Sequence, residues 1–169
     1  MGNKDARRYP VISLGAEHLV IGHLLRRNIL TYKARPHNEG YDLICIHPDP
    51  RKSSAQILRV QVKSRYQTDS DRAFPLKDKS FGAFDYLIVA FLNNGYYYKK
   101  HSVLDGREMP VFYTLPPEFL KKHHKKSKSG WERVLLKGLD DEMEQYKNER
   151  GFEIIANKLG VPYPGTESN

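Results

Sequence analysis

The stretch ILRVQVKSR, residues 57–65, holds the pattern that decides the fold. Its branched apolar residues favour an extended strand, and side chains alternate between the two faces of a strand. One face carries three apolar residues, as a core strand does: Leu58, Val60 and Val62. The other carries three long polar side chains: Arg59, Gln61 and Lys63. The apolar face fits a core strand, yet the same strand carries an amide and an amine near its end. This combination indicates a polar site at that end of a sheet.

The composition limits the class of protein. The chain has 169 residues, of which 28% are charged and 39% apolar, so we expect one soluble globular domain, or one domain with an appendage. No apolar run approaches the roughly 20 residues of a membrane span, and the first residues lack the apolar core of a secretory signal. The single cysteine, Cys45, excludes an intrachain disulfide framework and a cysteine-rich zinc site. We expect a reducing, cytoplasmic location.

The chain is strongly basic, with a formal net charge of +8 and a pI near 9.5. Such a surplus raises the local concentration of polyanions and speeds their encounter. The charge alone does not distinguish DNA, RNA, an acidic protein and an anionic membrane as the partner. We take it as a modest indication of nucleic acid.

The order of elements predicts an α/β or α+β core. Residues 13–28 read as a helix, and Asn94-Gly95 reads as a hairpin turn with a return strand over 96–101. Strands are predicted over 29–34, 41–47, 57–65, 84–92 and 109–115. Helices are predicted over 116–126, 138–149 and 151–159. We therefore divide the chain into a core over 1–115 and a helical C-terminal extension, packed on that core, over 116–169.

The first helix contains a carboxylate in an apolar stripe. Leu14, Glu17, Ile21 and Leu24 are spaced by three, four and three residues, so they share one face. Burying an unpaired carboxylate is costly, so either the helix turns Glu17 to the rim of the interface or Glu17 has a partner. A basic side chain is the favoured partner for an isolated glutamate, and a metal ion is the alternative.

Asp42 precedes the apolar run of residues 43–46. An aspartate is common where a turn becomes a strand. If strands 41–47 and 57–65 pair as a hairpin, however, the beginning of one lies beside the end of the other. Asp42 then meets Gln61 and Lys63, and we expect the helix that carries Glu17 to cover that face.

This set of groups suits phosphodiester hydrolysis. Oxygen ligands from Asp42, Gln61 and Glu17 fit Mg²⁺, with Mn²⁺ as an alternative. Such an ion lowers the pKa of a bound water and neutralises charge that builds up on the phosphoryl group. Lys63 can orient that water or stabilise the developing charge.

These residues resemble the PD-(D/E)xK nuclease superfamily: a glutamate on the first helix, an aspartate heading one strand and Gln-x-Lys on the next. The segment QVKSR, residues 61–65, is similar to the matching strand of Holliday-junction resolvases and of some homing and restriction endonucleases. The resemblance covers residues 11–92. It implies a restriction-endonuclease-like mixed β-sheet flanked by helices and Mg²⁺-dependent hydrolysis of DNA, leaving 5′-phosphates in most members.

The resemblance also implies roles for single residues. Asp42 takes the place of the metal-binding aspartate, Lys63 that of the catalytic lysine, and Glu17 that of a helix carboxylate that some branches add. Gln61 stands at the position usually held by Asp or Glu, and Tyr41 stands where many members have proline.

Contacts to nucleic acid are expected near the same strand, from Ser64 and Arg65, with Arg59 and Lys33 as further candidates. The basic run over 121–126 is interpreted as a solvated face, because neighbouring residues on a helix point about 100° apart. Residues 96–100, His18 with His23, and Cys45 are interpreted as structural.

The sequence leaves three functions open. The first is a metal-dependent deoxyribonuclease, for which double-strand cutting by so small a chain favours a homodimer. The second is a nucleic-acid-binding protein that kept the fold without the chemistry, and the third is a basic protein-interaction module. RNA stays open as an alternative to DNA.

Overall fold

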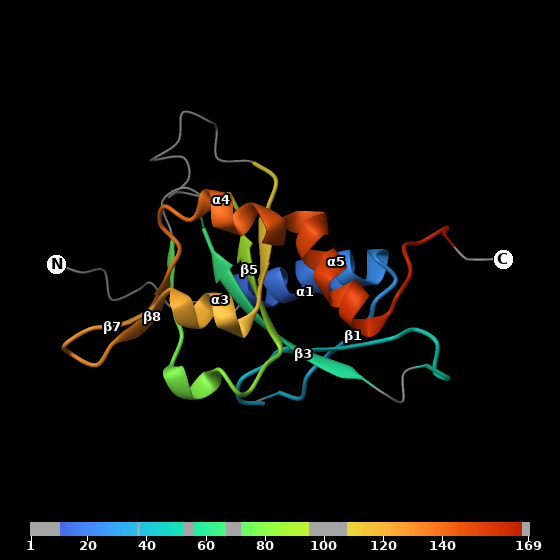
Figure 1. Cartoon of the computed structure of the whole chain (residues 1–169), viewed down its shortest axis with the longest axis horizontal. Helices are drawn as coiled ribbons and strands as arrows, with labels where there is room; N and C mark the ends of the chain where they lie inside the picture. The colour runs from blue at the N-terminus through green and yellow to red at the C-terminus, as the bar shows by residue number, and fades with distance from the viewer. Residues whose placement is uncertain (1–10, 37, 53–55, 67–71, 95–107, 167–169) are drawn as a thin grey trace.

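The computed structural model describes residues 11–36, 38–52, 56–66, 72–94 and 108–166, and Figure 1 shows the arrangement of its elements. The helices are α1 (Val11–Arg26), α3 (Pro117–Lys122), α4 (Asp140–Met143) and α5 (Asn148–Leu159), with short 3-10 turns η2 (Asp78–Ser80) and η3 (Glu144–Tyr146). The strands are β1 (Leu30–Lys33), β2 (Leu43–Ile46), β3 (Ile57–Arg65), β4 (Ala73–Pro75), β5 (Tyr86–Phe91), β6 (Val111–Leu115), β7 (His124–Lys126) and β8 (Glu132–Leu135). The predicted first helix and the predicted strands in the described ranges are confirmed.

The strands form two sheets. A five-stranded mixed sheet has the order β1-β2-β3-β5-β6, and a three-stranded sheet has the order β4-β8-β7. β2 and β3 pair antiparallel, as the hairpin prediction required, and β3 and β5 pair parallel. The predicted α+β class, a mixed sheet flanked by helices, is therefore confirmed.

One face of the large sheet packs on α1. Leu58 and Val60 of β3 share a buried cluster with Ala16, Val20 and Leu24. The predicted helix stripe was wrong in part, because Leu14 is 44% exposed. α1 carries apolar residues all around, so its sequence period does not fix which side faces the sheet.

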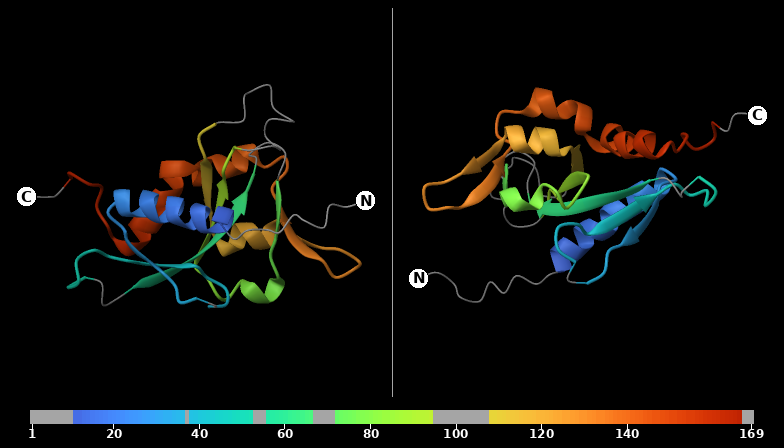
Figure 2. Two further views of the ribbon diagram at one scale, coloured as in Figure 1. Left: turned by 180° about the vertical axis from the view of Figure 1, so that it is seen from behind. Right: turned by 60° about the horizontal axis from the view of Figure 1, so that its bottom comes forward.

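The other face of the large sheet packs on the second half of the chain. Leu87 and Val89 of β5 share a cluster with Phe119 and Leu120 of α3 and with Val134 of β8. Figure 2 (right) shows α1 on one side of the strands, and α3 with β7 and β8 on the other.

The C-terminal part is not wholly helical. The helix predicted over 116–126 ends at Lys122, and residues 124–126 form β7. His124 leaves the helix because its ring nitrogen Nε2 lies 2.9 Å from the carbonyl of Leu76, on the segment after β4. Residues after 116 contribute to both buried clusters. The division at 115/116 itself remains a prediction.

A buried arginine joins the end of α1 to α5. Arg27 is 3% exposed, and its Nε and Nη2 donate to the two carboxylate oxygens of Glu153 at 2.7 and 2.8 Å. Its Nη1 and Nη2 also donate to the carbonyls of Pro162 and Val161. The planar fork of arginine suits this arrangement.

Glycine is required where α5 meets β6. A Cβ on Gly151 would lie 2.2 Å from the carbonyl oxygen of Tyr146 and 2.8 Å from the hydroxyl of Thr114. The close approach of α5 to the sheet therefore depends on this residue.

Two predictions fall partly or wholly outside this description. The return strand over 96–101 and the aromatic-basic run over 96–100 lie outside the described residues. Among the described helices, none is long and apolar enough to cross a membrane.

We predict that Arg27→Met lowers the free energy of unfolding by about 3 kcal/mol, because Glu153 and two carbonyls then lose a nearly buried cationic partner. Urea unfolding followed by circular dichroism measures the loss.

Arg26→Met is the matched control. Arg26 pairs with Glu149 at 3.0 Å in an exposed position, so its loss is expected to cost less than about 1 kcal/mol. Equal losses of unfolding free energy in the two variants would contradict the stabilising role assigned to the hydrogen bonds of Arg27.

Candidate active site

The candidate site lies where β2 and β3 part. β2 begins at Leu43, opposite Val60, whereas β3 continues to Arg65. The backbone N–H of Asp42 still donates to the carbonyl of Val60 at 2.9 Å. The next free N–H of β3, that of Val62, donates to Oδ2 of Asp42 at 2.7 Å. The Asp42 carboxylate thus takes the place of a backbone acceptor beyond the end of β2.

Gln61 and Lys63 lie on the face of β3 that points away from α1. Their partners on β5 are Leu87 and Val89, which belong to the cluster on the α3 side. The amide oxygen of Gln61 is buried and has no hydrogen-bond partner among the described residues. An unsatisfied buried acceptor costs about 1–3 kcal/mol, so this oxygen is poised for a ligand.

Burial disfavours the charged form of both ionisable groups at this place, the Lys63 amine and the Asp42 carboxyl. Burial lowers the pKa of the Lys63 amine, although the nearby Asp42 opposes the shift. Burial also raises the pKa of the Asp42 carboxyl; the Val62 N–H lowers it, Glu17 raises it, and Lys63 and Lys33 lower it. Groups whose charged forms are disfavoured in the folded state gather at functional sites.

Glu17 is close to Asp42 but has a partner of its own. Its Oε2 lies 2.8 Å from Nζ of Lys33, so the favoured expectation of a basic partner agrees with the structure. The expectation that α1 covers the face of Gln61 and Lys63 was wrong, because α1 packs on the face of Leu58 and Val60. Lys33, opposite Leu43 on β1, lies on the α1 side as well.

The remaining predicted contacts to nucleic acid differ in their surroundings. Arg59 is held by Asp85: its Nε and Nη2 donate to the carboxylate at 3.2 Å each, and its backbone N–H donates at 2.7 Å. This arrangement ties the start of β5 to β3 and occupies the guanidinium. Ser64 and Arg65 end β3 beside Ala90 and Phe91, half-buried.

The oxygens at this place fit a hard divalent cation. Asp42 has one carboxylate oxygen beyond the Val62 bond, Gln61 has its unpaired amide oxygen, and Glu17 is within electrostatic reach of Asp42. Within the described ranges, no group of three or more His, Cys, Asp or Glu residues could hold a metal ion. A cation here would therefore depend on the amide oxygen of Gln61 as well as on carboxylates.

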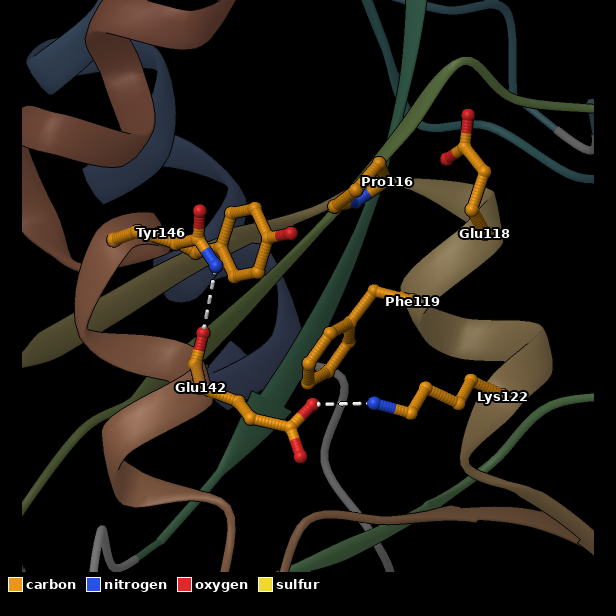
Figure 3. A pocket seen from close by; sticks show the side chains of 7 residues that line it. Pro116, Glu118, Phe119, Lys122, Glu142 and Tyr146 are labelled. Atoms are coloured by element: carbon orange, nitrogen blue, oxygen red, sulfur yellow. Dashed lines mark hydrogen bonds and ion pairs between the residues drawn. The ribbon is translucent and has the colours of Figure 1, made fainter.

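A pocket of about 430 Å³ between α3 and the α4–η3 segment is a different place (Figure 3). Its ammonium group, on Lys122, is paired with Glu142 at 2.8 Å, and Phe119 packs edge-on against Tyr146. With Glu118 as a second carboxylate in the lining, this pocket suits a polyanion poorly.

Cys45 and His23, which the sequence analysis interprets as structural, both pack within the fold. Burial raises the pKa of the Cys45 thiol to about 12, which agrees with a core residue. His23 packs against the rings of Phe112 and Phe152, with centroids 4.8 and 5.2 Å away. The sequence reasoning missed the hairpin of β7 and β8, for which the Ser127–Gly130 turn between two short polar runs was the available signal.

Comparison with known proteins supports the fold. No family model matches the chain, and no curated protein matches it. Among solved structures, the bacterial homing endonuclease I-Ssp6803I is similar, with a TM-score of 0.53 and 15% sequence identity. The similarity covers 95% of this chain and 96% of that one. The chain therefore has a fold similar to that of an endonuclease over nearly its whole length.

The site's charges predict a pH-dependent stability difference for Asp42→Asn, measured with a chelator present. The amide still accepts from Val62 but carries no charge. The folded-state pKa of Asp42 lies above the ordinary 3.8, so ionisation at neutral pH costs the parent folding free energy. The variant should be equally stable or more stable at pH 7, and its advantage should shrink as pH falls through the native pKa of Asp42 toward 3.8.

Urea unfolding of both proteins measures this difference. The pH values run from about 3.5 to about 7, which spans the range in which carboxyl groups titrate. A variant that is less stable than the parent at pH 7, with the deficit vanishing in acid, would show that the Asp42 charge stabilises the fold and would contradict this assignment.

Proposed function

We propose that the protein is a metal-dependent endonuclease that hydrolyses phosphodiester bonds of DNA, with Mg²⁺ as its cofactor and Mn²⁺ as an alternative. The observation that carries the proposal is that the Asp42 carboxylate accepts from Val62, between Gln61, whose buried amide oxygen has no partner among the described residues, and Lys63, whose amine is desolvated. The fold similar to that of a homing endonuclease supports the same activity.

The proposed roles follow from the chemistry of each group. Asp42 and Gln61 would hold the cation, which supplies a positive charge beside the scissile phosphate and acidifies a bound water. Glu17, which approaches Asp42 from the α1 side, would be a further ligand only past the end of β2, where Asp42 lies. Lys63 would place its ammonium against the phosphate oxygens and stabilise negative charge as the bond to the leaving oxygen breaks. Glu17 would have to exchange some of its contact with Lys33 for the cation.

The Val62–Asp42 hydrogen bond gives the Asp42 carboxylate a fixed orientation. A ligand held in this way needs no reorganisation when a cation or substrate arrives. The backbone of β3 therefore positions the acid, while the side chains of the same strand supply the amide and the amine.

The activity test uses supercoiled, nicked and four-way DNA with Mg²⁺ or Mn²⁺. We predict cleavage by the parent, and a loss of at least about 100-fold for Asp42→Asn and for Lys63→Met, which is the scale of removing one electrostatic group from an active site. Lys137→Met, which removes an exposed lysine outside the site, is the matched control and should cleave as the parent does.

Gln61 separates a functional role from a structural one. Gln61→Leu removes the unsatisfied acceptor, so it should leave stability unchanged or raise it, yet abolish cleavage. Gln61→Glu restores a charged ligand and should retain cleavage at equal or lower Mg²⁺ concentration. If Gln61→Leu cleaves as well as the parent, the amide is no ligand and the proposed centre is wrong.

The second candidate is a nucleic-acid-binding protein without catalysis. It is favoured by the neutral Gln61 at a position where a carboxylate would bind a cation more strongly, and by the Glu17–Lys33 ion pair. DNA binding without cleavage of any form, with either cation, would establish it in place of the nuclease. Failure to bind nucleic acid even at low salt would leave the basic interaction module.

A homodimer is part of the nuclease proposal, because cutting both strands requires two centres. The C-terminal helix α5 is a poor surface for it, since Phe152, Ile155, Ala156 and Leu159 are buried within the chain. Light scattering is expected to give twice the chain mass of 19.6 kDa. A monomeric mass would remove the dimer and leave single-strand cleavage untouched.

A further inference from the structure

The β7–β8 hairpin has two faces of different character. On the inner face, Val134 is buried and His124 packs against Phe81 with ring centroids 5.4 Å apart. Glu132 lies at the same face, where it accepts from the backbone N–H of Asp78 and contacts Lys126 at 3.7 Å. The inner face therefore anchors the hairpin to the body of the protein.

The outer face is basic and carries an exposed aromatic ring. Lys125 lies directly opposite Arg133 in the strand register, and Trp131 follows on the same face with 54% of its surface exposed. The guanidinium of Arg133 lies 5.2 Å from the centroid of the Trp131 ring, within the roughly 6 Å of a cation–π contact. Over 123–135 the single acid is Glu132, which belongs to the inner face.

This outer face is unfavourable for the hairpin itself. Like charges directly opposite on neighbouring strands destabilise the pair, and neither Lys125 nor Arg133 has a carboxylate partner among the described residues. Trp131 also leaves 54% of its surface exposed, even with the guanidinium of Arg133 over its ring. An anionic ligand with flat apolar surfaces would relieve both costs.

The hairpin projects beyond the rest of the described fold, on the α3 side of the large sheet, as Figures 1 and 2 show. Gln61 and Lys63 lie on that side of β3 too, because their partners on β5, Leu87 and Val89, pack with α3 and with Val134 of β8. A rod-like ligand that reaches the site can therefore extend along the hairpin.

We propose that the outer face of the β7–β8 hairpin is an arm that binds duplex DNA. Lys125, Lys128 and Arg133 contact backbone phosphates, and Trp131 packs on the sugar and base surfaces at the groove. Before Arg133, where β8 begins to pair with β4, the hairpin is a two-stranded ribbon, which fits the major groove, and apolar side chains there contact thymine methyl groups. This inference rests on the proposed function for the choice of DNA as the ligand.

The chain offers a direct reporter, because Trp131 is its one tryptophan. The experiment titrates Asp42→Asn protein, which is expected to bind without cutting, with a labelled DNA duplex. DNA anisotropy reports binding, and tryptophan emission reports contact at the hairpin. Both signals should change together and saturate at the same DNA concentration.

Lys125→Gln/Arg133→Gln then tests the phosphate contacts. Since each phosphate contact contributes about 0.9 to the slope of log K against log salt, losing two should reduce that slope by about 1.8. The control Lys52→Gln/Lys158→Gln removes the same charge from exposed positions on other elements and should change the slope little. Because the hairpin pair repels, its neutralisation should not lower the unfolding midpoint, which also verifies that the variant folds.

Several results would overturn the inference. Binding with unchanged Trp131 emission would place the hairpin outside the interface. Equal emission changes with heparin would make it a general polyanion surface, and equal salt slopes in the two double variants would remove the phosphate contacts. If the parent cleaves DNA while any of these holds, the arm alone is wrong; if it neither binds nor cleaves, the proposed function fails as well.

Discussion

The hydrogen bond from the Val62 N–H to the Asp42 carboxylate is the constraint on which the site depends. β2 stops at Leu43 while β3 runs on to Arg65, so the freed edge of β3 needs an acceptor. Asp42 supplies it and is thereby fixed beside Gln61 and Lys63. The amide oxygen of Gln61, next to Val62 in β3, is buried and has no partner among the described residues. Structure and chemistry thus share one side chain, which is why Asp42→Asn, rather than Asp42→Ala, isolates the charge.

The C-terminal third of the chain sets the surroundings of that site. α5 is held to α1 by the nearly buried Arg27, and α3 with β8 covers the face of the sheet on which Gln61 and Lys63 lie. Burial lowers the pKa of the Lys63 amine on that face. The hairpin of β7 and β8 belongs to the same layer, since Val134 of β8 packs in that cluster.

Much of this arrangement was predictable from local patterns. The alternation in residues 57–65 predicted both faces of β3, and the short turn before it predicted the hairpin with β2. That pairing brings Asp42 to Val62, whereas a common centre of Asp42, Gln61 and Lys63 stays a prediction. The orientation of α1 was not predictable, because apolar residues surround that helix and Leu14 competes with Ala16 for the core. The end of α3 at Lys122 was missed because the His124 contact to Leu76 joins segments distant in the sequence. Helix propensity alone does not contain that contact.

The central claim is that Asp42 and Gln61 together hold a divalent cation. Isothermal titration of Mn²⁺ into the protein without DNA measures this independently of cleavage. The account predicts one site per chain in the parent, weakened by Gln61→Leu and by Asp42→Asn, and undiminished in Gln61→Glu. Mn²⁺ binding that is equally strong in the parent and in both weakened variants, or absent from the parent, would contradict it.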